Sequence, residues 1–275
     1  MKFILDFFVL ITGIGAASGV HYNDNKLFIV SDNSNYLYEY RIKSKNLNKH
    51  LLQDMNGKNE QVDKDQKMDL EAIAYYKGTY HLFPSGSGAN RATLFTVAPT
   101  APPVIDSKDG SRLYTKVREL LNIPTEDFNI EGALFYNDTL LLFNRGNGPH
   151  KMNGIIKIPN DNSAAATFTR VQLPHINGNP AGFTDAILVG DKIYFLASAE
   201  SGNSNYLDGE IGGSQVGIIN LATLALEKAQ TITLKHKFEG ITLYRSTAKK
   251  HIFLLCEDPD NGETKSAIYR LKIRK

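Results

Sequence analysis

The sequence predicts an all-β chain folded as a five-bladed β-propeller with four-stranded blades, and a repeat carries this prediction. One short phrase occurs five times, as Ser18-Gly19-Val20, Glu71-Ala72-Ile73, Glu131-Gly132-Ala133, Asp185-Ala186-Ile187 and Glu239-Gly240-Ile241. Its first residues are 53, 60, 54 and 54 positions apart, close to one fifth of the 275-residue chain. A fixed period of this length with several short strands per copy is typical of propellers. We therefore expect one propeller domain spanning residues 1–275.

Each phrase is followed by a turn and then by an apolar run, which predicts the second strand of each blade. These runs are Leu27–Val30, Tyr80–Phe83, Leu140–Phe143, Ile193–Leu196 and Ile252–Leu255. Continuous apolar runs of four residues are typical of buried strands. Third strands are expected at 36–40, 92–97, 154–158, 216–219 and 267–273. Fourth strands are visible at 168–173 and 231–234, and the final segment of the second blade, 114–123, is expected to include a short helix.

The fifth copy ends without a fourth strand, and the N-terminal run Phe3–Leu10 supplies one. Pairing this run with the last blade closes the ring and removes a free sheet edge. The alternative is a secretory signal over residues 7–17, cleaved at Ala16-Ala17-Ser18. Asp6 within the apolar stretch and a single Lys2 favour the strand. We accordingly expect a cytoplasmic protein, with a periplasmic or secreted one as the alternative.

Composition excludes several functional classes. The chain has 31 basic and 29 acidic residues and a net charge of +2, so no excess of one sign predicts nucleic acid or an anionic membrane as a partner. No segment reaches the roughly 20 apolar residues of a membrane span. Cys256 is the single cysteine, which excludes an intramolecular disulfide. Its place at the end of an apolar strand favours a buried structural thiol over a catalytic one.

The first residues of the five phrases are candidate metal ligands: Ser18, Glu71, Glu131, Asp185 and Glu239. The first strand of every blade lines the axis of a propeller, so these side chains should converge at one mouth of the central channel. Four carboxylates in one place repel one another unless they are protonated or neutralised. A calcium ion, which accepts six to eight oxygen ligands in an adaptable geometry, satisfies such a ring. The alternative is that these residues cap backbone groups or lie in solvent.

The loops that join second to third strands are expected at the same mouth, and they are rich in Gly, Asn and charge. Long loops on one face of a rigid scaffold often carry function. We take as candidate substrate-binding residues Arg91, Arg145, Ser85, Asn144, Lys151 and Glu200. Candidate catalytic residues are Arg145, His150 and Asp32. Basic groups beside an acidic ring can neutralise a metal-bound phosphate or carboxylate. The alternative for Arg145 is a structural ion pair with ring carboxylates.

The order Ser, Glu, Glu, acidic, Glu at the blade starts, together with Val30-Ser31-Asp32, resembles the calcium-activated nucleotidases, or apyrases. The chain is also similar to uncharacterised bacterial propellers grouped with phytase-like and esterase-like domains. The resemblance implies a five-bladed fold with a central calcium. Carried over by position, Ser18, Glu71, Glu131 and Glu239 match calcium ligands, whereas Asp185 departs from the expected fourth-blade residue.

Two functional hypotheses from different classes follow. The first is a calcium-dependent hydrolase of a phosphate ester or anhydride, which would bind a small anionic ligand at the channel mouth. A lactonase or esterase would use a similar calcium-lined axis, and Glu-Gly phrases also occur at the first ligand of gluconolactonase-like propellers. The second hypothesis is a non-catalytic propeller whose calcium is structural and whose loops bind a ligand or a protein partner.

Overall fold

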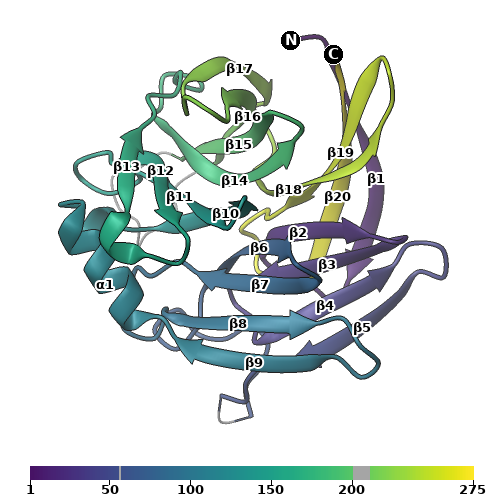
Figure 1. Ribbon diagram of the computed structural model, residues 1–275. Coiled ribbons are helices and arrows are strands. Elements are labelled where there is room, and N and C mark those ends of the chain that lie inside the picture. Colours follow the sequence, from purple (N-terminus) through teal and green to yellow (C-terminus); the bar gives the residue numbers. More distant parts are fainter. Residues whose placement is uncertain (56, 201–210) are drawn as a thin grey trace.

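The computed structural model describes residues 1–55, 57–200 and 211–275, and it shows five four-stranded antiparallel sheets around a central axis (Figure 1). The innermost strands β2, β6, β10, β14 and β18 contact one another in sequence, and β18 contacts β2 to complete the circle. The predicted five-bladed propeller is confirmed.

The first blade consists of β2 (Ala17–Asn23), β3 (Lys26–Ser31), β4 (Tyr36–Arg41) and β5 (Asn46–Leu51). The second consists of β6 (Leu70–Tyr76), β7 (Thr79–Pro84), β8 (Thr93–Ala98) and β9 (Val104–Asp109). Helix α1 (Ser111–Leu120) and the short 3₁₀ helix η1 (Thr125–Asp127) lead into the third blade.

The third blade is built from β10 (Ile130–Tyr136), β11 (Thr139–Arg145), β12 (Asn153–Pro159) and β13 (Thr167–Arg170), with the 3₁₀ helix η2 (Ser163–Ala165) before β13. The fourth contains β14 (Ala181–Val189), β15 (Lys192–Glu200), β16 (Ile211–Asn220) and β17 (Leu226–Thr233). The fifth contains β18 (Phe238–Ser246), β19 (Lys250–Glu257), β20 (Lys265–Arg274) and β1 (Phe3–Thr12).

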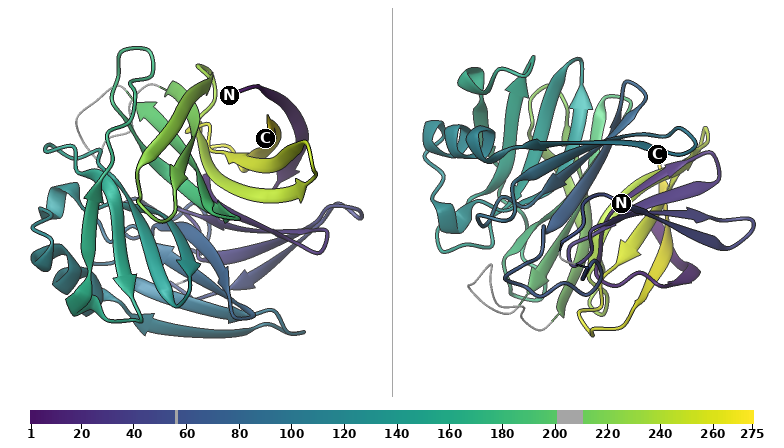
Figure 2. Two further views of the ribbon diagram at one scale, coloured as in Figure 1. Left: turned by 45° about the horizontal axis from the view of Figure 1, so that its top comes forward. Right: turned by 90° about the horizontal axis from the view of Figure 1, so that it is seen from below.

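The N-terminal strand β1 closes the ring as predicted. It pairs antiparallel with β20, with Phe3 opposite Ile273 and Leu10 opposite Ala267, so the two termini lie side by side (Figure 1, Figure 2). Asp6 joins the two strands through ion pairs with Arg270 and Lys272. Among the described residues, no helix has both the length and the apolar character of a membrane-spanning segment.

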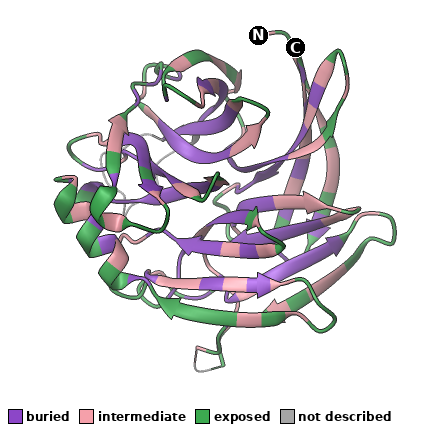
Figure 3. Cartoon of the chain, in the orientation of Figure 1, coloured by how far each residue is buried: buried purple, intermediate pink, exposed green. Residues whose placement is uncertain are grey.

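The outermost strands are the part of the fold that the sequence reveals least. The fourth strands of the first two blades, β5 and β9, were not predicted; β9 is largely exposed, and β5 is half exposed with no fully buried residue (Figure 3). An outer strand has a sheet neighbour on one side only, so its sequence needs no apolar run. The helix expected within 114–123 is confirmed as α1, which buries Tyr114 and Val117.

The core lies between adjacent blades rather than at the axis. Five apolar clusters fill the five interfaces, and each combines residues of two neighbouring sheets. Cys256 belongs to the cluster between the first and fifth blades and is fully buried, as predicted. Burial raises the pKa of the Cys256 thiol well above its ordinary value, so it remains a protonated structural group.

The glycines of the repeated phrase let neighbouring inner strands approach closely. A Cβ atom on Gly240 would lie 2.7 Å from Cys256 Sγ and 2.9 Å from the Ser18 carbonyl oxygen in the next blade. A Cβ atom on Gly19 would lie 2.9 Å from the Glu71 carbonyl oxygen. Gly19 and Gly240 are therefore needed in their blades because the neighbouring backbone occupies the space of a side chain.

Substitution of Gly240 tests this account. We expect Gly240→Ala to lower the free energy of unfolding by about 2–3 kcal/mol, because rigid neighbours must move to admit one methyl group. Gly88→Ala is the matched control, since its Cβ would meet only the flexible Arg91 side chain at 3.5 Å or more. Denaturant unfolding of both variants measures the difference, and equal stabilities would contradict the close-packing explanation.

His21 makes the fold sensitive to acid. Its ring lies among Tyr75 and Tyr80, with centroids 5.4 and 5.6 Å away, and burial lowers the pKa of His21 to about 4. The unfolded chain binds a proton near pH 6.5. Stability should therefore fall by up to about 3 kcal/mol as the pH drops from 6.5 to 4. His21→Phe should lose less stability over this window in pH-dependent thermal melts, and parallel curves for both proteins would refute the assignment.

Candidate functional site

Each inner strand begins with a β-bulge, and the bulged residues define the candidate site. The ladder skips Ser18 in β2, Glu71 in β6, Glu131 in β10 and Glu239 in β18. Bulges of this kind redirect a side chain and recur next to functional sites. The four side chains line one cavity at the mouth of the channel. The structure thus brings together four of the five predicted metal ligands.

Asp185 does not occupy the equivalent position. The ladder of the fourth blade skips Thr184, and Asp185 pairs with Leu196 as Gly240 pairs with Cys256. Asp185 accepts backbone hydrogen bonds from Ala186 N at 2.7 Å and Ile241 N at 2.8 Å, so it joins β14 to β18. Thr184, not Asp185, is therefore equivalent to Glu239, and the alignment of the repeats on their acidic residues was off by one position in this blade. The expected ring of five equivalent side chains is therefore wrong at Asp185.

The cavity measures about 370 Å³ and is lined mainly by charged groups. Among the described residues, the carboxylates that line it number eight: Asp32, Asp69, Glu71, Glu131, Glu239, Asp258, Asp260 and Glu263. Five cationic side chains accompany them: Lys64, Lys67, Arg91, Arg145 and Lys237. Full ionisation of these groups would leave an excess of negative charge.

One half of the cavity is organised by Lys67. This buried ammonium forms ion pairs with Asp32 and, at 2.7 Å, with Asp69. Arg91 also binds Asp69, at 2.9 Å. Burial alone would raise the pKa of Asp69, but the charges of Lys67 and Arg91 hold it below its ordinary value. Asp69 is therefore a carboxylate at neutral pH.

Arg145 and Lys237 organise the other half. The Arg145 guanidinium lies 3.4 Å from a Glu131 oxygen and 3.7 Å from Glu239. Lys237 lies 3.1 Å from Glu239 and 2.8 Å from Asp260. Arg145 thus forms ion pairs with ring carboxylates, which was the alternative to a role in catalysis or substrate binding. Both cations are buried, so these contacts are poorly screened by solvent.

Glu71 differs from the other carboxylates of the ring. Glu131 and Glu239 each form hydrogen bonds or ion pairs. Among the described residues, the Glu71 side chain has neither a hydrogen-bond donor nor an ion-pair partner. Burial raises the pKa of Glu71 well above its usual range, and the nearby charges of Glu131, Asp69 and Asp32 raise it further. The site of Glu71 therefore favours a carboxyl group that is neutralised, either by a proton or by a bound cation.

The residues around Glu71 fit a bound cation. One oxygen each of Asp32, Asp69 and Glu71 lies within 4.8 Å of the others. The Asp32 Oδ1 atom is buried and has no hydrogen-bond partner among the residues that the structure describes, although Oδ2 binds Lys67. Burial raises the pKa of Asp32, and the neighbouring Asp69 charge adds to this effect. An orphaned oxygen within an oxygen-rich, negatively charged cluster is the environment that a hard divalent cation requires.

Glu131 is positioned to hold a proton. Asn129 Nδ2 donates to Glu131 Oε1 at 2.7 Å, and Arg145 Nη1 lies 3.4 Å from both carboxyl oxygens. Burial raises the pKa of Glu131 to about 8, against the opposing charge of Arg145. The group is therefore protonated at neutral pH in the cation-free protein.

The raised pKa of Glu131 predicts a pH-dependent gain in stability on substitution. The folded protein binds this proton more tightly than the unfolded chain between pH 4.5 and 8, so ionisation destabilises the fold as the pH rises. Glu131→Gln should become more stable than the wild type by a few kcal/mol as the pH passes from 5 to 8.5. Thermal melts of chelator-treated proteins measure this, and a constant difference across the range would contradict it.

Several predicted binding residues lie outside the cavity lining. Ser85 is buried and donates to Asp69. Asn144 donates to the Asp127 and Met152 carbonyl oxygens and so supports the loop backbone. Lys151 also lies outside the lining, and the Glu200 side chain lies outside the part of the chain that the structure describes.

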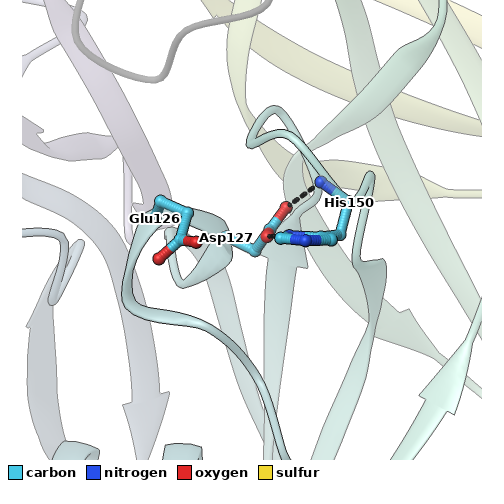
Figure 4. Close-up of side chains that lie close together, drawn as sticks. All are labelled: Glu126, Asp127 and His150. Atoms are coloured by element: carbon cyan, nitrogen blue, oxygen red, sulfur yellow. Dashed lines mark hydrogen bonds and ion pairs between the residues drawn. The ribbon is translucent and has the colours of Figure 1, made fainter.

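His150 fixes the loop between β11 and β12 instead of lining the cavity. Its Nδ1 atom lies 2.5 Å from Asp127 Oδ2, and its backbone N–H donates to Asp127 Oδ1 at 2.9 Å (Figure 4). Glu126 lies beside this pair, and one ligand atom of each residue falls within 4.8 Å of the others. This second cluster could hold a metal ion, but both oxygens of Asp127 already bind His150.

Four further residues that complete the site were not predicted from the sequence. Asp69, Asn129 and Lys237 each stand two positions before a predicted ligand, and Lys67 stands two positions earlier still. All four side chains line the cavity. A polar or charged residue two positions before the repeated phrase was therefore a usable signal in three blades. Asp32, predicted as a catalytic residue, also lines the cavity.

The model of a family of unknown function, DUF6929, matches residues 13–273. The chain belongs to this family. No curated protein matches the sequence significantly. The DUF6929 fold is nevertheless shared with solved propellers that differ strongly in sequence, so these comparisons establish fold and leave activity to the site itself.

Three solved structures illustrate that likeness. Glutaminyl cyclase of Myxococcus xanthus is 12% identical, with a TM-score of 0.57, and the match covers 98% of this chain and 97% of that one. An exo-1,5-alpha-L-arabinanase from a bovine ruminal metagenomic library is 11% identical, with a TM-score of 0.55 and 98% coverage of both chains. The Malassezia sympodialis allergen Mala s 1 is 9% identical, with a TM-score of 0.55 and 95% coverage of both.

Proposed function

We propose that this DUF6929 protein is a cation-dependent hydrolase of a small, uncharged ester or lactone, with its active site at the channel mouth. The observation that carries the proposal is the oxygen cluster of Asp32, Asp69 and Glu71 in a cavity of about 370 Å³. A second buried carboxyl group, Glu131, lines the same cavity and holds a proton at neutral pH. A cation site and a proton donor in one pocket suit hydrolysis.

Asp32, Asp69 and Glu71 would hold the cation. Calcium fits best, because carboxylate oxygens from two blades form an adaptable site and not a tight octahedron. When bound, the cation polarises a carbonyl oxygen of the substrate and stabilises the negative charge that develops on it. Lys67 lies between two of the ligands, so its ammonium fixes their positions and limits the charge of the site.

The contacts of the two guanidinium groups in the cavity favour an uncharged substrate over a phosphate ester or anhydride. Phosphate recognition generally uses guanidinium groups that can donate to its oxygens. Arg91 instead donates to Asp69, to Ser87 and, at 2.8 Å, to the Lys64 carbonyl oxygen. The contacts of Arg145 with Glu131 and Glu239 similarly occupy its guanidinium.

Glu131 supplies the proton chemistry. In the hydrolysis of an ester or lactone, water adds to the carbonyl carbon and the bond from that carbon to the alcohol oxygen breaks. The Glu131 carboxyl group donates its proton to the departing alcohol oxygen, and the attacking water returns a proton to the carboxylate. Asn129 holds Oε1 and so orients the group. A carboxyl group with a pKa near neutrality is suited to this role.

The proposal is tested by measuring hydrolysis after chelator treatment, with and without added calcium. The panel comprises γ- and δ-lactones, aryl acetates, p-nitrophenyl phosphate and pyrophosphate. We expect calcium-dependent turnover of a lactone or acetate, and its loss in Glu131→Gln. Turnover confined to the phosphorylated compounds would overturn the assigned substrate class.

The panel also separates catalysis from binding. Calcium binding without turnover of any compound would favour the non-catalytic alternative, in which the cation pins the blades and the loops bind a ligand or a protein partner. Turnover that is unaffected by chelation would instead remove the cation from the mechanism. Glu263→Gln is the matched control, because Glu263 lines the cavity but its side chain is 54% exposed.

A further inference from the structure

We propose a second ligand site, between the second and third blades, that binds a small aromatic cation. A cavity of about 670 Å³ lies there, lined by residues of β6 to β9, α1, β10, β11 and the turn after β12. Its volume falls within the range of small-molecule sites. This site is independent of the proposed hydrolase activity.

The cavity lies toward the opposite end of the blades from the channel mouth. Tyr76, the last residue of β6, lines it, whereas Glu71 stands near the start of the same strand. Five residues of extended strand separate the two positions by about 16 Å. A ligand of ordinary size therefore cannot occupy both sites.

Aromatic and aliphatic side chains form the walls. Tyr76 stacks on Phe135 with centroids 4.5 Å apart, and the His81 ring lies 4.9 Å from Phe135. Leu94 and Leu140 complete the apolar wall and remain only partly buried at the surface of the core between the two blades. An apolar ligand that packed against these side chains would remove apolar surface from water, which favours binding.

The polar rim selects a positive charge. Asp106, Asp138 and Asp161 line the cavity, and Lys108 is the one cationic side chain among the described lining residues. Asp138 already binds the ammonium of Lys77, which lies 5.0 Å from the centre of the Tyr76 ring. The Asp138 carboxylate and the face of the Tyr76 ring thus already bind one cation, the ammonium of Lys77, at this rim. Burial lowers the pKa of His81, so its neutral ring adds no opposing charge.

The experiment uses thioflavin T, a cationic aromatic dye, with 1-anilinonaphthalene-8-sulfonate as its anionic counterpart. The natural sequence contains no tryptophan, so Phe135→Trp supplies a single reporter in the cavity wall. We expect saturable quenching of this tryptophan by thioflavin T and weaker binding of the anionic dye. Tyr75→Trp is the control, because Tyr75 precedes Tyr76 but does not line the cavity.

Two further variants keep the test decisive. Asp106→Asn combined with Asp161→Asn should weaken thioflavin T binding about fivefold, which is the expected size for two exposed charge contacts. Thr96→Phe should block the cavity, because Thr96 lines it, and it adds no second tryptophan. An absence of saturable binding, equal affinity for both dyes, or unchanged binding in the blocked variant would overturn the proposal. Retained binding in Glu71→Gln would show that the dye does not occupy the channel mouth.

Discussion

Lys67→Met is expected to lower the free energy of unfolding of the calcium-free protein by about 3 kcal/mol. The substitution removes the ammonium that pairs with Asp32 and Asp69. Asp69 is 3% exposed and Lys67 is 8% exposed, so the remaining carboxylates would be left buried with little compensation from water. Removing one partner of a buried ion pair typically destabilises a protein by this amount.

Calcium should restore much of that stability. A cation bound by Asp32, Asp69 and Glu71 supplies the charge that the variant has lost, and it no longer faces an ammonium beside its ligands. We therefore expect Lys67→Met to bind calcium more tightly than the wild type and to gain more stability from it, because a ligand that binds only the folded state stabilises it.

Denaturant unfolding with and without calcium measures both effects. Lys58→Met is the matched control, since Lys58 pairs with Asp63 in an exposed contact where both side chains are more than half exposed. Such a pair contributes at most about 1 kcal/mol. An equal loss of stability in both variants, or no recovery of Lys67→Met with calcium, would contradict the assigned role of Lys67.

Glu71→Gln is expected to reduce calcium-dependent hydrolysis at least a thousandfold, while the fold remains intact. The substitution removes one of three charged ligands, and the loss of several kcal/mol of charge stabilisation corresponds to roughly this factor. Stability should not fall in the absence of calcium, because burial and neighbouring carboxylates already disfavour the ionised form of Glu71. A neutral amide of similar shape relieves that repulsion.

Steady-state hydrolysis and thermal melts of the same preparation separate the two effects. Glu263→Gln removes an exposed carboxylate from the same cavity and should leave hydrolysis within a fewfold of the wild type. Loss of activity accompanied by loss of structure, or full activity in Glu71→Gln, would each show that Glu71 is not the cation ligand that we propose.

The repeat made most of the fold predictable. Inner and middle strands are buried, so the apolar runs of β3, β7, β11, β15 and β19 were visible, and the closing role of β1 followed from the strand missing in the last blade. The polar strands β5 and β9 carry no such signal, because they lie at the edges of their sheets.

The site was predictable only in part, and for a related reason. The spacing of the repeats located Ser18, Glu71, Glu131 and Glu239. It could not show that the bulge of the fourth blade falls on Thr184, one residue before Asp185. Nor could spacing reveal the ion pairs of Lys67, Arg145 and Lys237, because these depend on side chains of different blades and loops meeting in space.

Calcium titration of the chelator-treated protein by calorimetry tests the central claim most directly. We expect one ion to bind per chain with micromolar affinity. The heat should differ between buffers of low and high ionisation enthalpy, because binding displaces the proton that the raised pKa of Glu71 retains. Glu71→Gln should bind more weakly and show a smaller buffer dependence. Absence of calcium binding, or binding that Glu71→Gln leaves unchanged, would contradict a cation site at the mouth of this propeller.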